Sequence, residues 1–159
     1  LGGSQYLLIE HGLRAGIPPR LDLKREGTLQ NLILDSAKNR ILNSCHDLSE
    51  GGFAVALAEC LLGKVGHPLG ADVNWPGTRP IGNSLRQDTL LFGESQSRVL
   101  VSLSPAKAHD LESQAKRHGV PYFKIGQVTK SGLQIESLIN LSSEQIEKAY
   151  REAIPRRMN

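Results

Sequence analysis

The sequence is poor in aromatic residues, which make up 4% of its 159 positions, and it lacks a dense basic run. Its 19 Lys and Arg against 16 Asp and Glu give a net charge of +3, and the main basic cluster is Arg151, Arg156 and Arg157. A surface that follows nucleic-acid phosphates needs a basic stripe with aromatic side chains for stacking. We therefore expect no nucleic-acid partner and interpret the C-terminal arginines as a solvated tail.

Long apolar runs are absent as well. No stretch approaches the roughly 18 consecutive apolar residues of a membrane-spanning helix, and the N-terminus lacks a basic region followed by an apolar run and a cleavage site. We therefore expect no membrane partner. Because the chain begins at Leu1 rather than Met, we expect it to be a fragment of a larger protein.

Cysteine is scarce, and several common site motifs are missing. Cys45 and Cys60 both fall in apolar segments, so we expect buried structural thiols and a reducing, cytoplasmic compartment. There is no Gly-x-x-x-x-Gly-Lys-Ser/Thr loop, no Gly-x-Gly-x-x-Gly, no Cys-x-x-Cys and no His-Glu-x-x-His. If the chain handles ATP, it must use a less common architecture.

What the sequence does contain is enough hydrophobic residues, 39%, for one core, which predicts a single domain over residues 1–159. Apolar periodicity predicts the following helices: 1–8, 28–39, 53–62, 104–119 and about 142–153. It predicts the following strands: 41–45, 69–75, 98–103, 122–128 and 132–135, the last two forming a hairpin around Lys130-Ser131. We expect a connector without packed structure at 12–20 and a loop at 76–86.

Residues typical of helix ends support several of these elements. Thr28 and Ser142 or Ser143 are placed as N-caps, Ser104-Pro105 starts a helix, and Gly119 ends it. Helices and strands are mixed without strict alternation, which predicts an α+β domain with helices layered on a mixed sheet.

The strongest candidate site is His46-Asp47-Leu48-Ser49-Glu50-Gly51-Gly52, which lies between a strand and a buried helix. Backbone N–H groups at a helix N-terminus favour an anion, and paired glycines let a phosphate approach the backbone. Asp47 would repel a bare phosphate but would be useful if Mg²⁺ lay between them. The alternative is purely structural: Asp47 or Ser49 caps the helix, and the glycines let it pack.

A second candidate is Phe92-Gly93-Glu94-Ser95-Gln96-Ser97-Arg98, directly before a Val-rich strand. It offers a carboxylate, hydroxyls, an amide and a guanidinium, groups that can bind phosphate oxygens. Its alternative is a turn stabilised by its own side chains. In that case we expect Arg98 to pair with Glu94 or Asp47 and to hold the turn against the helix N-terminus.

Four ordered matches resemble phosphoribosylformylglycinamidine synthase subunit II. The segment 46–59 is similar to its His-Asp-x-Ser-Asp/Glu-Gly-Gly-x-Ala-Val-Ala-Leu-Ala-Glu stretch, and 92–98 to Phe-x-Glu-Ser-Gln-Ser-Arg. The opening 1–7 resembles Leu-Gly-Gly-Ser-Glu-Tyr-Leu, and 125–128 resembles Ile-Gly-x-Val. The departures at Gln5, Glu50 and Phe53 are mild.

The resemblance implies a place in the aminoimidazole ribonucleotide (AIR) synthetase superfamily and a three-layer α/β/α C-terminal-type domain with a mixed sheet. The parent ligase of purine biosynthesis converts formylglycinamide ribonucleotide to the amidine with ATP and glutamine-derived ammonia. The implied partners are the remaining domains of the same enzyme, a glutaminase and small accessory subunits. The alternatives are a domain of another ATP-dependent superfamily enzyme and a non-catalytic scaffold.

For individual residues, the resemblance implies that Asp47 is a metal ligand for Mg²⁺ and that Ser49, with Gly51 and Gly52, forms part of an ATP- or ADP-binding site. It implies no catalytic residue within this chain, so we expect the fragment alone to be inactive. For the second cluster, Glu94, Ser95, Gln96 and Arg98, either a phosphate-binding or a structural role stays open.

Overall fold

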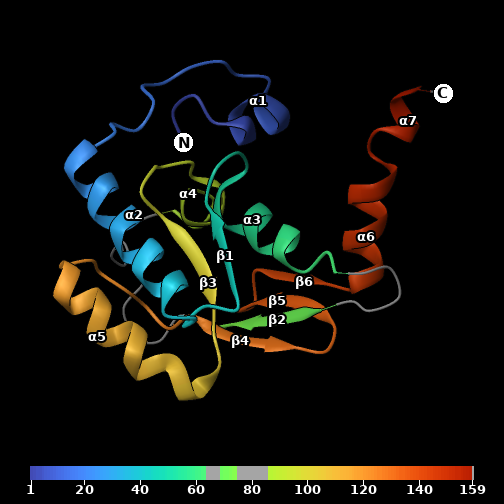
Figure 1. Cartoon of the computed structure of the whole chain (residues 1–159). Helices are drawn as coiled ribbons and strands as arrows, with labels where there is room; N and C mark the ends of the chain where they lie inside the picture. Colours follow the sequence, from blue (N-terminus) through green and yellow to red (C-terminus); the bar gives the residue numbers. More distant parts are fainter. Residues whose placement is uncertain (64–68, 75–85, 159) are drawn as a thin grey trace. The chain divides into compact units, whose positions relative to one another are not determined.

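The computed structural model describes residues 1–63, 69–74 and 86–158, with the element order shown in Figure 1. The helices are α1 (Gln5–His11), α2 (Leu23–Lys38), α3 (Gly52–Cys60), α4 (Gln87–Phe92), the short 3₁₀ helix η1 (Pro105–Lys107), α5 (Ala108–His118), α6 (Ser143–Glu152) and α7 (Pro155–Met158). The strands are β1 (Ser44–Asp47), β2 (Gly70–Val73), β3 (Val99–Ser102), β4 (Gly126–Thr129), β5 (Gly132–Ile135) and β6 (Ile139–Leu141). The predicted α+β class with a mixed sheet is confirmed.

The chain divides into two compact units, and a single domain over residues 1–159 stays a prediction. One unit comprises 1–56 and 84–123, and the other comprises 57–83 and 124–159. The predicted loop at 76–86 lies almost wholly outside the described residues. No helix within the described ranges is long and apolar enough to cross a membrane.

The first unit carries β1 paired antiparallel with β3, so that Asp47 lies opposite Val99. Helix α2 lies beside α5, as Figure 1 shows. Between these helices the buried Ser36 donates a hydrogen bond to the Gln114 side chain at 2.8 Å. At their ends, His118 Nε2 lies 3.0 Å from a carboxylate oxygen of Asp35. These contacts fix the scaffold beside the β1–β3 pair.

The start of α2 differs from the prediction. The helix begins at Leu23, and Asp22 caps it by accepting hydrogen bonds from Lys24 N–H and Arg25 N–H, both at 3.0 Å. Thr28 is not the cap. It lies in the second turn, where its hydroxyl donates to the Lys24 carbonyl at 2.8 Å. The side chains of the first turn are mostly exposed, so this turn carries no apolar period. The periodic pattern in the sequence therefore starts about one turn after the helix does.

The second unit contains a four-stranded mixed sheet in the order β4-β2-β5-β6. Strand β2 is antiparallel to β4 and parallel to β5. Its core is formed by apolar side chains of β2, β5 and α6: Val73, Leu133, Ile135 and Ile146. Ser142, one of the two predicted caps, precedes α6 and forms a reciprocal capping box with Gln145, which was not predicted.

The predicted hairpin between β4 and β5 is wrong, because β2 lies between them and pairs with both. The two-residue link at Lys130-Ser131 instead passes across the start of β2. Gly70 permits this crossing, since a Cβ there would lie 2.3 Å from the Ser131 carbonyl oxygen. The hairpin of this sheet joins β5 to β6, a three-residue strand that the sequence pattern did not indicate.

The remaining predictions are mostly confirmed, with shifted ends. Helices α1, α3 and α5 form, Gly119 ends α5 in the left-handed conformation with φ +68°, and 12–20 forms no helix or strand. Strand β1 begins at Ser44, three residues later than predicted. The helices α4 and α7 were not predicted. Cys45 is exposed and Cys60 half-buried, so the predicted burial of both thiols is wrong.

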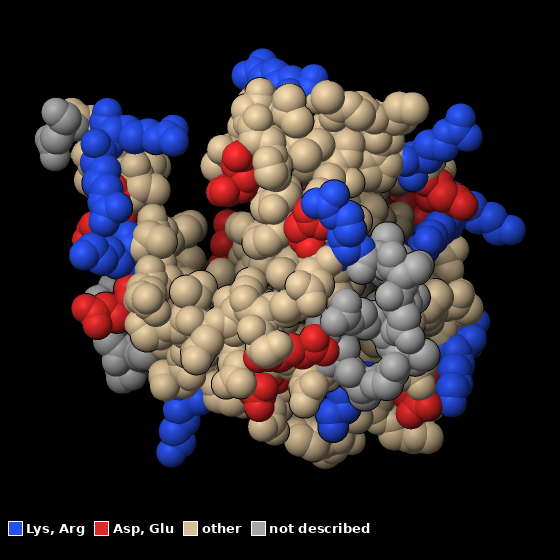
Figure 2. Space-filling view, turned by 180° about the vertical axis from the view of Figure 1, so that it is seen from behind, with Lys and Arg blue, Asp and Glu red and all other residues tan. Residues whose placement is uncertain are grey.

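Charged side chains of both signs are interspersed on the face shown in Figure 2. Two of the described basic side chains near the C-terminus pair with a carboxylate one helical turn away. Arg151 lies 3.8 Å from Glu147, and Arg156 binds Glu152. These pairs are partly exposed, and pairs of this kind contribute little stability but reduce the local charge excess.

Candidate functional site

The candidate site lies where β1 ends and α3 begins. Leu48 N–H donates to the Arg98 carbonyl at 3.0 Å, which extends the β1–β3 ladder past Asp47. Gly52 N–H then donates to the Ser49 carbonyl at 3.1 Å and closes the turn into α3. We call residues 47–52 the Asp47 turn. Asp47 and Ser49 are both exposed on it, so their side chains are accessible to a ligand.

The two glycines give the turn its shape. Gly51 has φ +78° and Gly52 has φ +65°, a left-handed conformation that costs other residues about 1–2 kcal/mol. A Cβ on Gly52 would also lie 2.6 Å from the Gly93 carbonyl oxygen. The Asp47 turn therefore contacts, backbone to backbone, the second motif that the sequence singled out.

Glu94 makes the polar connection between the two motifs. Its Oε1 accepts a hydrogen bond from Gly51 N–H at 2.8 Å. The same oxygen accepts one from Gln5 N–H, in the first turn of α1, at 2.9 Å. Gly51 N–H, which we expected to face a phosphate, is thus satisfied inside the protein. Gln5 as a partner was missed, because nothing in the sequence links two positions 89 residues apart.

Arg98 serves a different purpose from the one expected. Its guanidinium donates to the backbone carbonyls of Gly93 and Ser95, the latter at 3.2 Å. Among the described residues no ion pair joins Arg98 to Glu94 or Asp47, so that expectation is wrong. Burial lowers the pKa of the guanidinium from its usual value. An arginine satisfies two carbonyls of one tight turn because its donors form a planar fork.

The other residues of the second cluster, Ser95, Gln96 and Ser97, have different surroundings. Ser95 contributes its carbonyl to Arg98, and Gln96 is exposed. Ser97 has φ +59° and donates its hydroxyl to Glu26 on α2 at 2.6 Å. That hydrogen bond is the main reason the pKa of Glu26 is lowered. Sequence reasoning missed Glu26, which lies 71 residues away.

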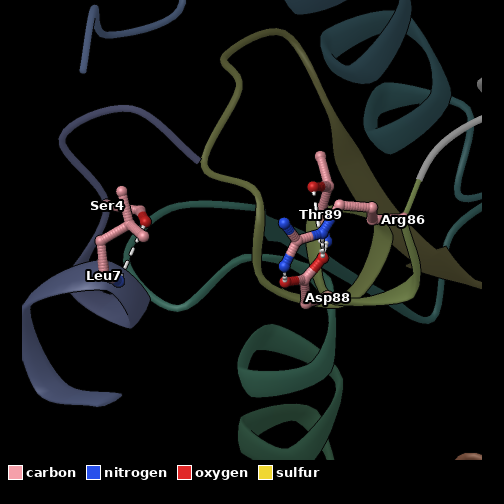
Figure 3. A network of polar contacts seen from close by, with 5 residues as sticks. All are labelled: Ser4, Leu7, Arg86, Asp88 and Thr89. Atoms are coloured by element: carbon pink, nitrogen blue, oxygen red, sulfur yellow. Dashed lines mark hydrogen bonds and ion pairs between the residues drawn. The ribbon is translucent and has the colours of Figure 1, made fainter. Parts of the chain in front are cut away.

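Polar contacts also fix the starts of α1 and α4 (Figure 3). Ser4 caps α1 by accepting a hydrogen bond from Leu7 N–H at 3.3 Å. The Asp88 carboxylate binds the Arg86 guanidinium at 2.5 Å and accepts from Thr89 N–H at 2.7 Å. The hydrogen bond from Arg86 is the main cause that lowers the pKa of Asp88. Both helices therefore begin at defined positions beside the cluster.

The match to a known family covers most of this structure. The model described as "AIR synthase related protein, C-terminal domain" matches residues 1–137. The chain belongs to this family. Relatives named phosphoribosylformylglycinamidine synthase subunit PurL are 38% identical over 157 residues in Anaeromyxobacter sp. (strain Fw109-5) and 40% identical over 159 residues in Moorella thermoacetica. The predicted resemblance to the synthase is confirmed.

Each of these alignments covers 98% of the chain and 20% of the relative, so this AIR synthase related domain spans about a fifth of the relatives' length. Among solved structures, Thermotoga maritima PurL complexed with ADP matches 80% of the chain and 22% of its own, with a TM-score of 0.67 and 22% identity. The match to PurLQS from the same organism covers 91% of this chain and 24% of the PurLQS chain, with a TM-score of 0.63 and 22% identity. At this identity the likeness shows the fold.

The Asp47 turn carries two exposed carboxylates, those of Asp47 and Glu50. No group of three His, Cys, Asp or Glu side chains in the described segments is arranged to hold a metal ion. Mg²⁺ does not require such a group, since it commonly takes one or two carboxylates and fills its shell with phosphate oxygens and waters. The exposed carboxylates and the exposed Ser49 hydroxyl of this turn are therefore of the kinds that a Mg–nucleotide takes as partners.

Proposed function

We propose that this chain is the C-terminal domain of a phosphoribosylformylglycinamidine synthase and contributes one wall of a Mg–nucleotide site. The synthase converts formylglycinamide ribonucleotide to formylglycinamidine ribonucleotide with ATP and glutamine-derived ammonia. The observation that carries the proposal is the 38–40% identity to PurL along 98% of the chain. Solved relatives of the same fold are complexed with ATP, ADP and AMPPCP.

Within this domain we assign three roles. The Asp47 carboxylate is a Mg²⁺ ligand, and the Ser49 hydroxyl is a nucleotide contact. Gly51 and Gly52 give the turn the shape that exposes both side chains. No residue of this chain is assigned to the chemical step. Ligand pockets lie preferentially between domains, so one domain supplies one wall of the pocket.

The partners follow from the same proposal. The remaining domains of the synthase complete the site, and a glutaminase with small accessory subunits supplies ammonia. A relative from Thermotoga maritima was solved as PurLQS, which supports an assembly of several subunits. The cytoplasm is the compartment that this role implies.

Calorimetric titration tests the proposal. Mg–ADP is titrated into the chain alone and into the synthase assembled from the chain and its remaining domains. We expect strong binding in the assembled synthase and weak or no binding to the chain alone, with no amidine formed by the chain alone. Binding that is unchanged when the chain is omitted from the assembly contradicts the proposal.

The same titration, together with an assay of amidine formation, addresses the alternatives. A scaffold without ligand contact is favoured by one observation, that Gly51 N–H and Glu94 satisfy each other within the protein. A scaffold would leave nucleotide affinity insensitive to changes at Asp47 and Ser49. A domain of another AIR synthase superfamily enzyme would bind Mg–nucleotide but would not support amidine formation.

A further inference from the structure

Glu94 joins three segments that are distant along the chain. Its Oε1 accepts from Gly51 N–H at 2.8 Å and from Gln5 N–H at 2.9 Å, over separations of 43 and 89 residues. The side chain is half-buried. Two hydrogen bonds to one ionised oxygen are charge-assisted, which makes them shorter and stronger than neutral ones. Glu94 thus fixes the start of α1 and the Asp47 turn to the same atom.

The surroundings of Glu94 hold it in place. Arg98 binds the carbonyls of Gly93 and Ser95 on either side of it, so the backbone that carries Glu94 is fixed. The rings of Tyr6 on α1 and Phe92 at the end of α4 are stacked, with centroids 4.7 Å apart and planes 4° apart. The Glu94 carboxylate is therefore already oriented toward Gly51 N–H, and little side-chain entropy is lost when the hydrogen bond forms.

The charge of Glu94 decides what Gly51 can bind. The Glu94 carboxylate already accepts the hydrogen bond of Gly51 N–H. A phosphate that approached the same N–H would lie in contact with this carboxylate, and the two anions would repel each other. A nucleotide at the Asp47 turn must therefore be held through the exposed Asp47 and Ser49 side chains. What Glu94 contributes is the position of the turn that carries them.

We propose that Glu94 is a positioning residue for the Mg–nucleotide site. By accepting a hydrogen bond from Gly51 N–H, it holds the Asp47 turn in the shape that presents Asp47 and Ser49 to the ligand, and it does not touch the ligand. This inference rests on the proposed function. On this view the second cluster has the structural role rather than the phosphate-binding one, and it affects nucleotide affinity only indirectly.

Two substitutions at Glu94 in the assembled synthase separate positioning from ligand contact. Glu94→Gln keeps an oxygen that can accept both hydrogen bonds, so we expect its Kd for Mg–ADP to stay within about threefold of wild type. Glu94→Ala removes the acceptor, and we expect a Kd about tenfold higher with an unchanged dependence on Mg²⁺ concentration. Glu10→Ala is the matched control, because it removes one carboxylate from the exposed surface of α1.

The outcomes are distinct. Rescue by Gln with loss by Ala supports positioning. If Glu94→Gln weakens binding as much as Ala does, and shifts the Mg²⁺ dependence, then Glu94 contacts the ligand through its charge and the inference is wrong. It is also wrong if both variants bind like wild type while Asp47→Asn binds weakly. If Asp47→Asn binds like wild type, the proposed function itself has failed.

Discussion

Gly52 meets two constraints at once, a left-handed backbone and a carbonyl that leaves no room for a side chain. A Cβ would lie 2.6 Å from the Gly93 oxygen, which is backbone and cannot rotate away. We expect Gly52→Ala to lower the free energy of unfolding by about 3 kcal/mol or more, since conformational strain and overpacking add. Urea denaturation of the chain measures this.

Gly119 provides the control for this substitution. It has nearly the same φ, +68°, but nothing lies within 4 Å of its would-be Cβ. Gly119→Ala should therefore cost only the conformational strain, about 1–2 kcal/mol. Equal losses for the two variants would show that the close contact between the two motifs contributes nothing.

Asp47 has a charge that a capping role does not need. Asn keeps the size of the side chain and can still cap a helix, but it loses the negative charge that Mg²⁺ binds. We expect Asp47→Asn in the assembled synthase to raise the Kd for Mg–ADP at least about tenfold, with little change in Tm without ligand. A lower Tm with unchanged affinity would support the capping alternative instead.

Sequence reasoning located both clusters but not their internal connections. Residues 46–52 and 92–98 stood out because polar groups and glycines interrupt apolar segments there, and the structure brings them together. The partners could not be predicted, since Glu94 bonds backbone N–H groups, which every residue except proline carries. The expected partners of Arg98 were carboxylates, but a half-buried turn also offers backbone carbonyls, which every residue carries.

At the scale of elements, the α2 cap gives a direct test of the corrected boundary. Asp22 satisfies two N–H groups at the start of the helix, whereas Thr28 donates to a carbonyl inside it. We expect Asp22→Ala to lower the free energy of unfolding by about 1 kcal/mol. Thr28→Ala should change it little, because alanine favours the helix interior. Urea denaturation compares them, and a larger loss for Thr28→Ala would contradict the observed boundary.

The hydrogen bond from Ser97 to Glu26 ties α2 to the second cluster and should respond to pH. The hydroxyl stabilises the ionised carboxylate, so the pKa of Glu26 lies below its ordinary value of 4.5. The sign follows from linkage: this contribution to stability is present above about pH 4.5 and is lost as the pH falls through the lowered pKa. Ser97→Ala should move the pKa of Glu26 back toward its ordinary value.

An NMR titration of the glutamate carboxyl groups measures that shift. Glu112 is an internal control, because Lys116 is the main cause that lowers its pKa and Ser97 plays no part. A Glu26 pKa that stays the same in Ser97→Ala would show that the hydrogen bond does not persist in solution.

Elements with marked ends were predictable, whereas the order of the strands in the sheet was not. Gly119 ends α5 as predicted, and Ser142, one of the two predicted caps, starts α6, because each residue acts on its own neighbours. Strand order depends on contacts between distant segments. Gly70 lets the Lys130-Ser131 link cross the start of β2, a role that a lone glycine does not reveal before the pairing is known.

At the scale of the whole molecule, the likeness extends past the family model. The AIR synthase related model ends at residue 137, whereas the alignments to PurL span 157 to 159 residues and cover 97–98% of the chain. Most of residues 138–159, a segment that carries β6, α6 and α7, is therefore shared with the synthase relatives beyond the general domain. Four ordered motifs were enough to predict this kinship, since each is specific only in combination.

Reconstitution of amidine formation tests the central claim most directly. The remaining domains of the synthase are assayed with formylglycinamide ribonucleotide, Mg–ATP and ammonia, first alone, then with this chain, and the chain is also assayed by itself. We predict amidine formation only when both parts are present, and its loss when the added chain carries Asp47→Asn. Amidine formed by the chain alone, or activity of the remaining domains that is the same with and without the chain, would contradict the account.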